Sequence, residues 1–186
     1  SMSQHYFDSG TVCYHIIPMV NPDGVTISQS GVLDETQQII YENDMDAGYT
    51  TVNSTAYAKE WKANAKGIDL NRNFPSGWDD SDRRASPSSE QYRGPKPFSA
   101  AESIALRDYT LKYDFDATIS FHSSGNVIYY QYGDCQPINR QSQSLAQSVE
   151  RTTGYTLEEN DGTDGAGFKT RTVQCIRPVS NHRADS

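Results

Sequence analysis

The sequence predicts an α/β fold in which a mixed, mostly parallel central sheet is flanked by helices. The apolar, β-branched run at residues 11–20 is typical of a strand buried on both faces of such a sheet, and residues 115–121 are expected to form a further strand. Helical periods at 99–112 and 138–153 alternate with these strands, which favours a sandwich with the sheet in the middle. The chain of 186 residues has the length of one domain, so we expect residues 1–186 to form a single domain.

The first part of the chain is expected to run from a strand through a turn into a polar stretch. The strand at 11–20 is followed by Asn-Pro-Asp-Gly at 21–24, a composition that is typical of a turn. Residues 26–58 are polar and irregular, with a short helix expected at 34–41. This segment is either an excursion over the surface or a lid, and the sequence leaves both readings open.

A long loop and a capped helix are expected in the middle of the chain. Residues 75–98 are rich in proline, serine, glycine and charge, which indicates an ordered loop rather than a linker between domains. Ser99 and Glu102 have the spacing of a capping box at the start of the helix that ends near Lys112. The later elements are expected to be a strand, an extended segment and a helix, at residues 115–121, 127–132 and 138–153.

Composition excludes several classes of protein. With 24 acidic and 16 basic side chains the net charge is −8, which argues against a nucleic-acid binder that neutralises phosphates. No apolar run approaches the roughly 20 residues that a membrane span needs, and no signal peptide is recognisable. The cysteines Cys13, Cys135 and Cys175 fit no Cys-x-x-Cys pattern, and their odd number leaves at least one thiol unpaired.

His122 is the first candidate for a functional side chain. It stands where the β-branched and aromatic run of residues 119–121 gives way to small polar residues, a place where a strand can deliver a metal ligand. The alternative for any single histidine is an ordinary core or surface imidazole. The other histidines, His5, His15 and His182, have no comparable context.

Asn71 and Arg72 are the second candidates. The guanidinium group is a rigid fork that holds a carboxylate through two parallel hydrogen bonds, which suits recognition of a substrate carboxylate. The alternative is that Arg72 pairs with one of the many acids of the chain. Nearby, Asp69 is expected to stabilise the loop.

These motifs, in this order, resemble the zinc metallocarboxypeptidase family over about residues 12–169. Residues 61–75 and the segment after His122 are most similar to the bacterial branch that cleaves γ-D-glutamyl-diamino acid bonds in cell-wall peptides. Digestive-type carboxypeptidases remain the alternative. The resemblance rests on residues 17–24, 67–75, 92–99 and 120–125, and more weakly on 165–169.

The resemblance implies a carboxypeptidase-like fold and a zinc-dependent hydrolase. His122 would be a zinc ligand, Asn71, Arg72 and Ser123 would bind the substrate, and Lys62 would polarise the scissile carbonyl. The implied partner is a peptide, such as a peptidoglycan stem peptide, and the implied location is outside the cell or at the cell wall.

Two parts of the family pattern are not found in this sequence. The family takes its other zinc ligands from a His-x-x-Glu motif. Here His5 is followed three residues later by Asp8 rather than by a glutamate, and it lies too close to the first strand. The general-base glutamate is also missing, because residues 170–186 form an atypical tail without glutamate. We therefore expect an incomplete sheet that lacks its first strands.

An incomplete sheet has consequences for function. Unpaired strand edges invite pairing with another chain, so we expect self-association. The catalytic residues are unknown, and we expect this chain to be inactive by itself. The alternatives are a non-catalytic module that binds peptides or carboxylates, and one half of a complemented or oligomeric enzyme.

Overall fold

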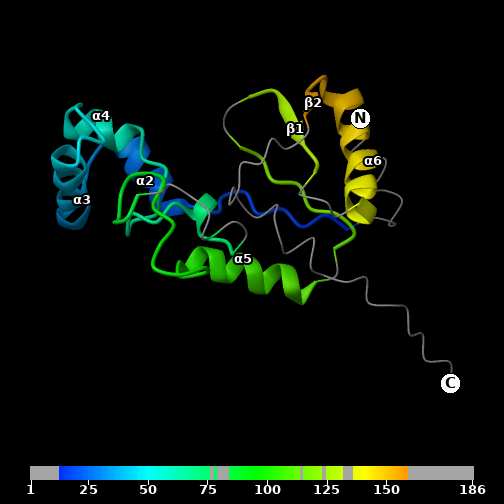
Figure 1. The fold of residues 1–186 in the computed structure, drawn as a ribbon, viewed down its shortest axis with the longest axis horizontal. Helices are drawn as coiled ribbons and strands as arrows, with labels where there is room; N and C mark the ends of the chain where they lie inside the picture. Colours follow the sequence, from blue (N-terminus) through cyan, green and yellow to red (C-terminus); the bar gives the residue numbers. More distant parts are fainter. Residues whose placement is uncertain are drawn as a thin grey trace.

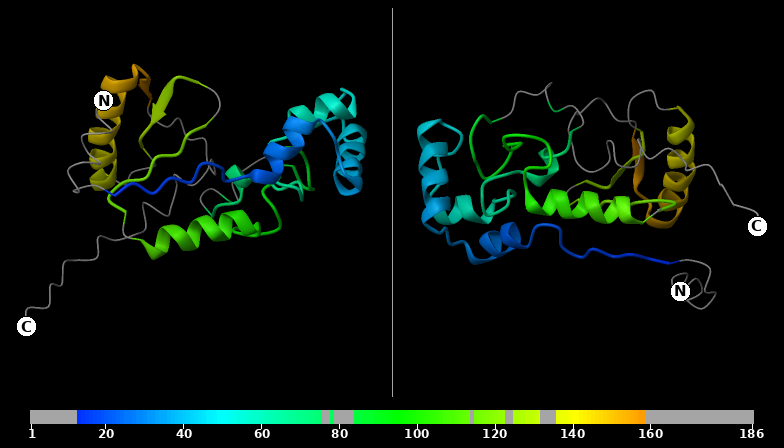
Figure 2. Two further views of the ribbon diagram at one scale, coloured as in Figure 1. Left: turned by 180° about the vertical axis from the view of Figure 1, so that it is seen from behind. Right: turned by 90° about the horizontal axis from the view of Figure 1, so that it is seen from below.

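The structure is a computed structural model that describes residues 13–75, 78, 84–113, 115–122, 125–131 and 136–158. Figures 1 and 2 place α2, α3 and α4 together at one end, α6 with β1 and β2 at the other, and α5 between them. The elements are α2 (Pro22–Ser30), α3 (Glu35–Asp46), α4 (Ser54–Lys59), the short 3₁₀ helix η1 (Leu70–Arg72), α5 (Ala101–Lys112), β1 (Val127–Tyr129), α6 (Gln136–Thr153) and β2 (Thr156–Glu158).

The expected turn at residues 21–24 is the start of α2. The side chain of Asn21 accepts a hydrogen bond from the backbone N–H of Gly24 at 3.0 Å, and Pro22 occupies the first turn, where a missing N–H costs little. Two further bonds join Asn21 to the backbone oxygens of Lys62 and Ala63, each at 3.0 Å. Asn21 thus caps the helix and ties it to the segment that carries Lys62.

The polar stretch at 26–58 is helical rather than irregular. The helix expected at 34–41 is confirmed and extends to Asp46, with Asp34 and Gln37 forming a capping box. Several apolar residues of this stretch, such as Val32, Ile39 and Met45, are exposed, so the sequence shows no clean apolar face for these helices. The core of this end of the molecule combines buried residues of this stretch with two that follow it: Ile27, Ile40, Tyr57, Ala58, Trp61 and Ala63, with Leu33 and Tyr41 packed against them.

The expected capping box of Ser99 and Glu102 is wrong. The first residue of α5 is Ala101, and its N-cap residue, Ala100, makes no side-chain cap. The fully buried amide of Asn73 donates to Ser99 Oγ at 2.8 Å and accepts from the N–H of Ala100 at 3.0 Å. A side chain distant in sequence therefore replaces the local cap. The carboxylate of Glu102 instead accepts a hydrogen bond from the side-chain amide of Asn64.

The α/β class with parallel strand pairing is confirmed at the other end of the molecule. β1 and β2 pair in parallel, with Val127 opposite Thr156 and Tyr129 opposite Glu158. The helix expected at 138–153 connects them as α6. Strand, helix and parallel strand form a βαβ unit, the building block of the predicted fold class.

The two runs expected to be core strands do not pair within the described residues. Residues 13–20 run along the molecule from α2 toward the other end, and 115–121 carry no strand assignment (Figure 1). Ile16 is 79% exposed, so the burial on two faces expected of residues 11–20 is absent, and Phe121 in the second run is 90% exposed. A strand of this composition needs neighbouring strands, and the described part of the chain supplies none for it.

Two remaining expectations concern membranes and thiols. None of the described helices combines the length and apolarity needed to cross a bilayer. Cys13 is an exposed free thiol, whereas Cys135 and Cys175 lie outside the described residues.

Candidate functional site

A cleft of about 730 Å³ brings together candidate residues that are far apart in sequence. Lys62, Asn71, Arg72 and His122 all line it. Ser123 lies outside the described residues. The other lining residues come mainly from α2, from η1 and its flanks, and from α5: Val20, Asn21, Gly24, Val25, Ser28, Gln29, Trp61, Asp69, Leu70, Phe74, Gln91, Ser103, Leu106, Ser120 and Phe121.

Asn71 and Arg72 reach the cleft on η1, which Asp69 organises. The buried carboxylate of Asp69 accepts from the backbone N–H of Asn71 at 3.0 Å, and its carbonyl accepts from that of Arg72 at 2.9 Å. Its second carboxylate oxygen accepts from the N–H of Gln91 at 2.9 Å. The expectation that Asp69 stabilises this loop is confirmed by these contacts.

The guanidinium group of Arg72 is held by neutral groups rather than by an acid. Its Nε donates to Gln91 Oε1 at 3.2 Å, and Nη1 makes a long contact of 3.4 Å with the carbonyl of Asn71. No ion pair joins Arg72 to a carboxylate within the described residues. The alternative that Arg72 serves only to pair with an internal acid therefore has no support in this part of the chain.

Lys62 brings a second cation to the same cleft. Its Nζ lies 2.8 Å from Glu90 Oε2, and the hydrogen bond and charge of Glu90 raise the pKa of the ammonium above its usual value. The side chains are 65% and 31% exposed, so water screens the pair and its contribution to stability is small. Lys62 is therefore protonated at neutral pH.

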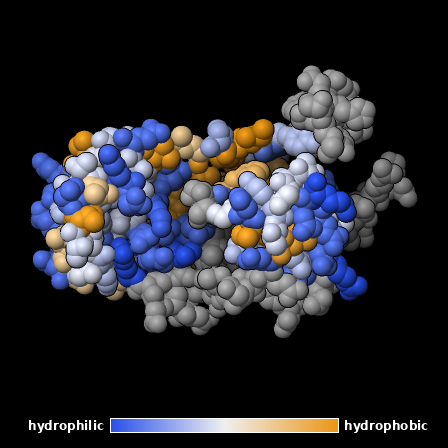
Figure 3. Space-filling model, turned by 90° about the horizontal axis from the view of Figure 1, so that it is seen from above, coloured by the Kyte–Doolittle hydropathy of each residue, from blue (hydrophilic) through white to orange (hydrophobic). Residues whose placement is uncertain are grey.

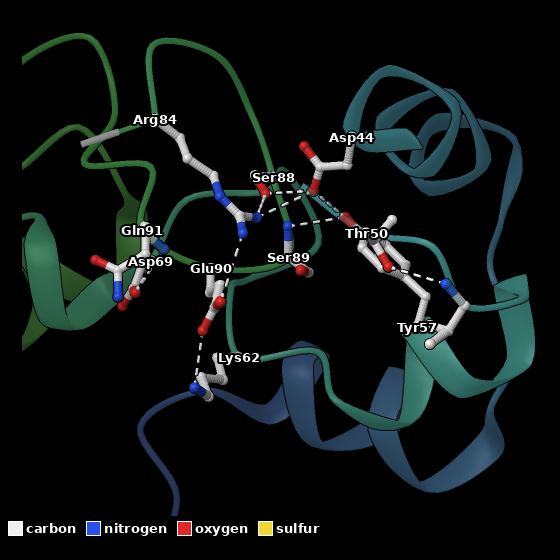
Figure 4. Close-up of polar contacts among 11 residues, drawn as sticks. Asp44, Thr50, Tyr57, Lys62, Asp69, Arg84, Ser88, Ser89, Glu90 and Gln91 are labelled. Carbon is white, nitrogen blue, oxygen red and sulfur yellow. Dashed lines mark hydrogen bonds and ion pairs between the residues drawn. The ribbon is translucent and has the colours of Figure 1, made fainter. Parts of the chain in front are cut away.

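A buried polar network lies behind Lys62 (Figure 4). Asp44, which is 1% exposed, accepts hydrogen bonds from the hydroxyls of Tyr57 and Ser88, each at 2.5 Å, and from Arg84 Nη1 at 3.2 Å. Burial, reinforced by the bond to Asp44, raises the pKa of Tyr57 to about 12. Because Arg84 Nη2 also lies 3.5 Å from Glu90, the network continues to Lys62.

The described residues do not by themselves form a zinc site. A catalytic zinc takes about three protein ligands. No group of three His, Cys, Asp or Glu side chains suitable for a metal occurs in the described ranges. Asp69, which lines the same cleft as His122, is already engaged with two backbone N–H groups. His122 is thus a single candidate ligand, and no reaction step through zinc follows from these residues.

Glu90 and Gln91 are site residues that sequence reasoning missed. Both lie in the loop expected at 75–98, where the local sequence gives no signal for a contact with Lys62 or Arg72. Their proximity to these cations follows from hydrogen bonds that join the backbone of this loop to residues 61–72. Figure 4 shows Glu90 beside Lys62 and Gln91 beside Asp69.

Known proteins are similar to this chain over most of its length. A family profile described as zinc carboxypeptidase matches residues 11–185. A relative named gamma-D-glutamyl-L-diamino acid endopeptidase 1, from Lysinibacillus sphaericus, is 30% identical over 161 residues, which are 86% of this chain and 38% of that protein. The uncharacterized protein YqgT of Bacillus subtilis (strain 168) is 29% identical over 163 residues, covering 83% of this chain and 40% of that protein.

Other relatives differ in the activity that their names state. A protein of Talaromyces stipitatus named inactive metallocarboxypeptidase ecm14 is 25% identical over 177 residues, covering 86% of this chain and 30% of that protein. The chain spans roughly two fifths of the first two relatives and less of this one. No solved structure matches the protein.

Proposed function

The chain belongs to the zinc carboxypeptidase family, and from this premise we propose that its cleft binds the free carboxylate of a peptide within a zinc-dependent peptidase. The observation that carries the proposal is that Arg72, Asn71 and Lys62 line one cleft while no described acid neutralises Arg72. A chain with a net charge of −8 needs such a local cluster of cations to hold an anionic ligand.

The contacts of Arg72 leave much of its fork open for a ligand. Nε is fixed by Gln91, and Nη2 has no hydrogen-bond partner among the described residues. A carboxylate can therefore receive bonds from the outer edge of the guanidinium, with the amide of Asn71 as a neighbouring donor. Lys62 adds a point charge for a second oxygen of the peptide, either a carboxylate or a carbonyl.

We propose a bacterial cell-wall peptide as the substrate, in which D-glutamate is joined through its γ-carboxyl to a diamino acid. The name of the Lysinibacillus sphaericus relative supports this choice. The α-carboxylate of the D-glutamate is free on one side of the scissile bond, and a diamino acid that ends the peptide or carries a side-chain carboxylate supplies a second one, which suits a cleft with two cations. In this proposal His122 contributes one zinc ligand to the whole enzyme, and Ser123 contacts the substrate.

A non-catalytic module that binds peptides is the second candidate function. It is favoured by the contrast within the cleft, because the carboxylate-binding groups are assembled whereas the described residues offer one candidate zinc ligand. A relative named as an inactive metallocarboxypeptidase supports this reading. In this second reading we expect residues 1–186 to bind a carboxylate without turnover.

Zinc binding and hydrolysis distinguish these functions. The test compares the protein with His122→Ala and, as a control, with His15→Ala, because His15 bonds to Tyr109 and does not line the cleft. Each protein is assayed for bound zinc, for binding of γ-D-glutamyl-L-lysine and for its hydrolysis.

Each outcome assigns a function. Zinc-dependent hydrolysis that only His122→Ala abolishes would establish the peptidase. Binding of the peptide without hydrolysis, unchanged by zinc, would establish the binding module. Failure to bind the peptide at all would contradict both.

A further inference from the structure

Glu90 and Gln91 stand between the buried polar network and the two cations of the cleft. Each makes one side-chain contact to a cation that lines the cleft: Glu90 to Lys62 at 2.8 Å, and Gln91 to Arg72 at 3.2 Å. We propose that this pair is a positioning element, which fixes the spacing between the Lys62 ammonium and the Arg72 guanidinium and so selects ligands with two anionic groups. The ligand class rests on the proposed function, whereas the positioning itself does not.

The backbone around this pair is fixed to the segments that carry the cations. The carbonyl of Ser89 accepts from the N–H groups of Lys62 and Ala63, at 2.9 and 2.8 Å. The N–H of Gln91 donates to the Asp69 carboxylate at 2.9 Å, and that carboxylate also orders η1. The positioning residues therefore cannot shift without moving the backbone of Lys62 or of Arg72.

Gln91 adopts a backbone conformation that is unfavourable for its residue type. Its φ is 65°, in the left-handed region where glycine is the usual residue. Such strain persists where surrounding contacts enforce it, and it is frequent at functional sites. Here the bond to Asp69 enforces it, and the amide oxygen of Gln91 reaches Arg72 Nε. A glycine would relieve the strain but would lose this contact.

Glu90 derives its orientation from the buried network. One carboxylate oxygen lies 2.8 Å from Lys62, and the other lies 3.5 Å from Arg84. Arg84 is held in turn by Asp44 and by Ser88 (Figure 4). Since an exposed ion pair adds little stability, the value of the Glu90 to Lys62 contact lies in where it holds the ammonium.

The direction in which Glu90→Gln changes ligand affinity distinguishes a positioning role from simple electrostatic attraction. Glu90→Gln removes a negative charge beside the cleft, so Coulomb attraction alone would make any anion bind more tightly. If Glu90 positions Lys62, the same substitution weakens a ligand that uses both cations. Glu42→Gln is a matched control, because Glu42 bonds to Gln38 on α3 and does not line the cleft.

The first experiment needs no ligand. Hydrogen exchange at Nε of Arg72 is measured by nitrogen-15 NMR in the wild type, in Gln91→Ala and in Gln91→Gly. We expect exchange about tenfold faster in both variants, because loss of a hydrogen bond exposes the N–H to water. Gln91→Gly should be at least as stable as Gln91→Ala, since it relieves the strain at φ 65°. Unchanged exchange in both variants would overturn the role of Gln91.

The second experiment measures binding of N-acetylglycine, which has one carboxylate, and of N-acetyl-D-glutamate, which has two. We expect Gln91→Ala to weaken both by about threefold to tenfold, and Glu90→Gln to weaken only the second by a similar factor. Tighter or unchanged binding of N-acetyl-D-glutamate by Glu90→Gln would overturn the positioning role of Glu90. If the wild type binds neither compound, selection of two anionic groups is overturned together with the proposed function, and the exchange experiment still decides whether Gln91 positions Arg72.

Discussion

The helical end of the molecule and its extended apolar segments differ in how their side chains are paired. Around α3, α4 and the 84–92 loop, buried polar groups such as Asp44 and Ser88 have internal partners. Along 13–20 and 115–122, large apolar side chains are exposed and the described backbone joins no sheet (Figure 3 shows the apolar surface of one face in orange). The side of the cleft that carries Lys62 and Arg72 thus belongs to a framework of paired polar groups, whereas His122 lies on a segment without sheet neighbours among the described residues.

The largest effect is expected from breaking the framework at Asp44. Asp44→Asn leaves the guanidinium of Arg84 without its buried counter-ion, and removal of one member of a buried pair costs about 3 to 5 kcal/mol. Urea denaturation followed by circular dichroism measures the loss in free energy of unfolding. Asp46→Asn, on the exposed last residue of α3, is the control. A loss below about 1 kcal/mol would mean that the network does not stabilise this end.

The next largest effect is expected at Gly67. Its φ is 71°, and an added Cβ would lie 2.9 Å from both Pro87 Cβ and Ser88 N, so Gly67→Ala should cost about 2 to 3 kcal/mol. Gly48→Ala is a matched control, since Gly48 has φ 73° with no atom within 4 Å of the added Cβ. It should cost only the conformational strain, about 1 kcal/mol. Equal losses in the two variants would show that the 84–92 loop is not packed against Gly67.

The response to alkaline pH should depend on Tyr57. Its pKa is raised to about 12 from 10.0, so the folded state keeps the phenolic proton longer than the unfolded state. The resulting stability is complete below pH 10 and is lost as the pH rises from 10 toward 12. Unfolding in urea at a series of pH values should show a steeper alkaline decline in the wild type than in Tyr57→Phe.

The control for this response is Tyr49→Phe, because Tyr49 is half exposed. It should keep the wild-type slope. A decline that persists unchanged in Tyr57→Phe would assign the alkaline sensitivity to other groups.

The smallest effect on stability is expected in the extended segments. Ile16→Ser and Phe121→Ser remove side chains that are already in water, so the free energy of unfolding should change by no more than about 0.5 kcal/mol. Their effect should appear instead in sedimentation velocity, as a weaker tendency to self-associate through the exposed apolar surface. A stability loss comparable to that of Asp44→Asn would mean that these side chains are buried in solution.

The sequence predicted which residues meet at the site better than it predicted how they are held. Lys62, Arg72 and His122 stand in motifs with recognisable chemistry, and all three line the cleft. Gln91 was missed because its role depends on a left-handed backbone and on a contact 19 residues away, neither of which has a local signal. Likewise the local cap at Ser99 was replaced by Asn73, 26 residues earlier in the chain.

The strands show the limit of composition as a guide. Residues 11–20 and 115–121 have the composition of strands, but a strand forms only where a neighbour supplies its backbone partners. Val127–Tyr129 is only three residues long, yet it is a strand because Thr156–Glu158 pairs with it. Pairing between distant segments, which composition does not encode, decides between the two outcomes.

The most direct test of the central claim is calorimetric titration of the metal-free protein with γ-D-glutamyl-L-lysine and with the same peptide after amidation of its carboxylates. Charge-assisted bonds to Arg72 predict that the acid binds about tenfold more tightly than the amide. Arg72→Gln should abolish this difference, and Arg107→Gln, at an arginine paired with its neighbour Asp108 on α5, should preserve it. Equal affinity of the wild type for acid and amide, or an unaltered preference in Arg72→Gln, would contradict a carboxylate-binding cleft.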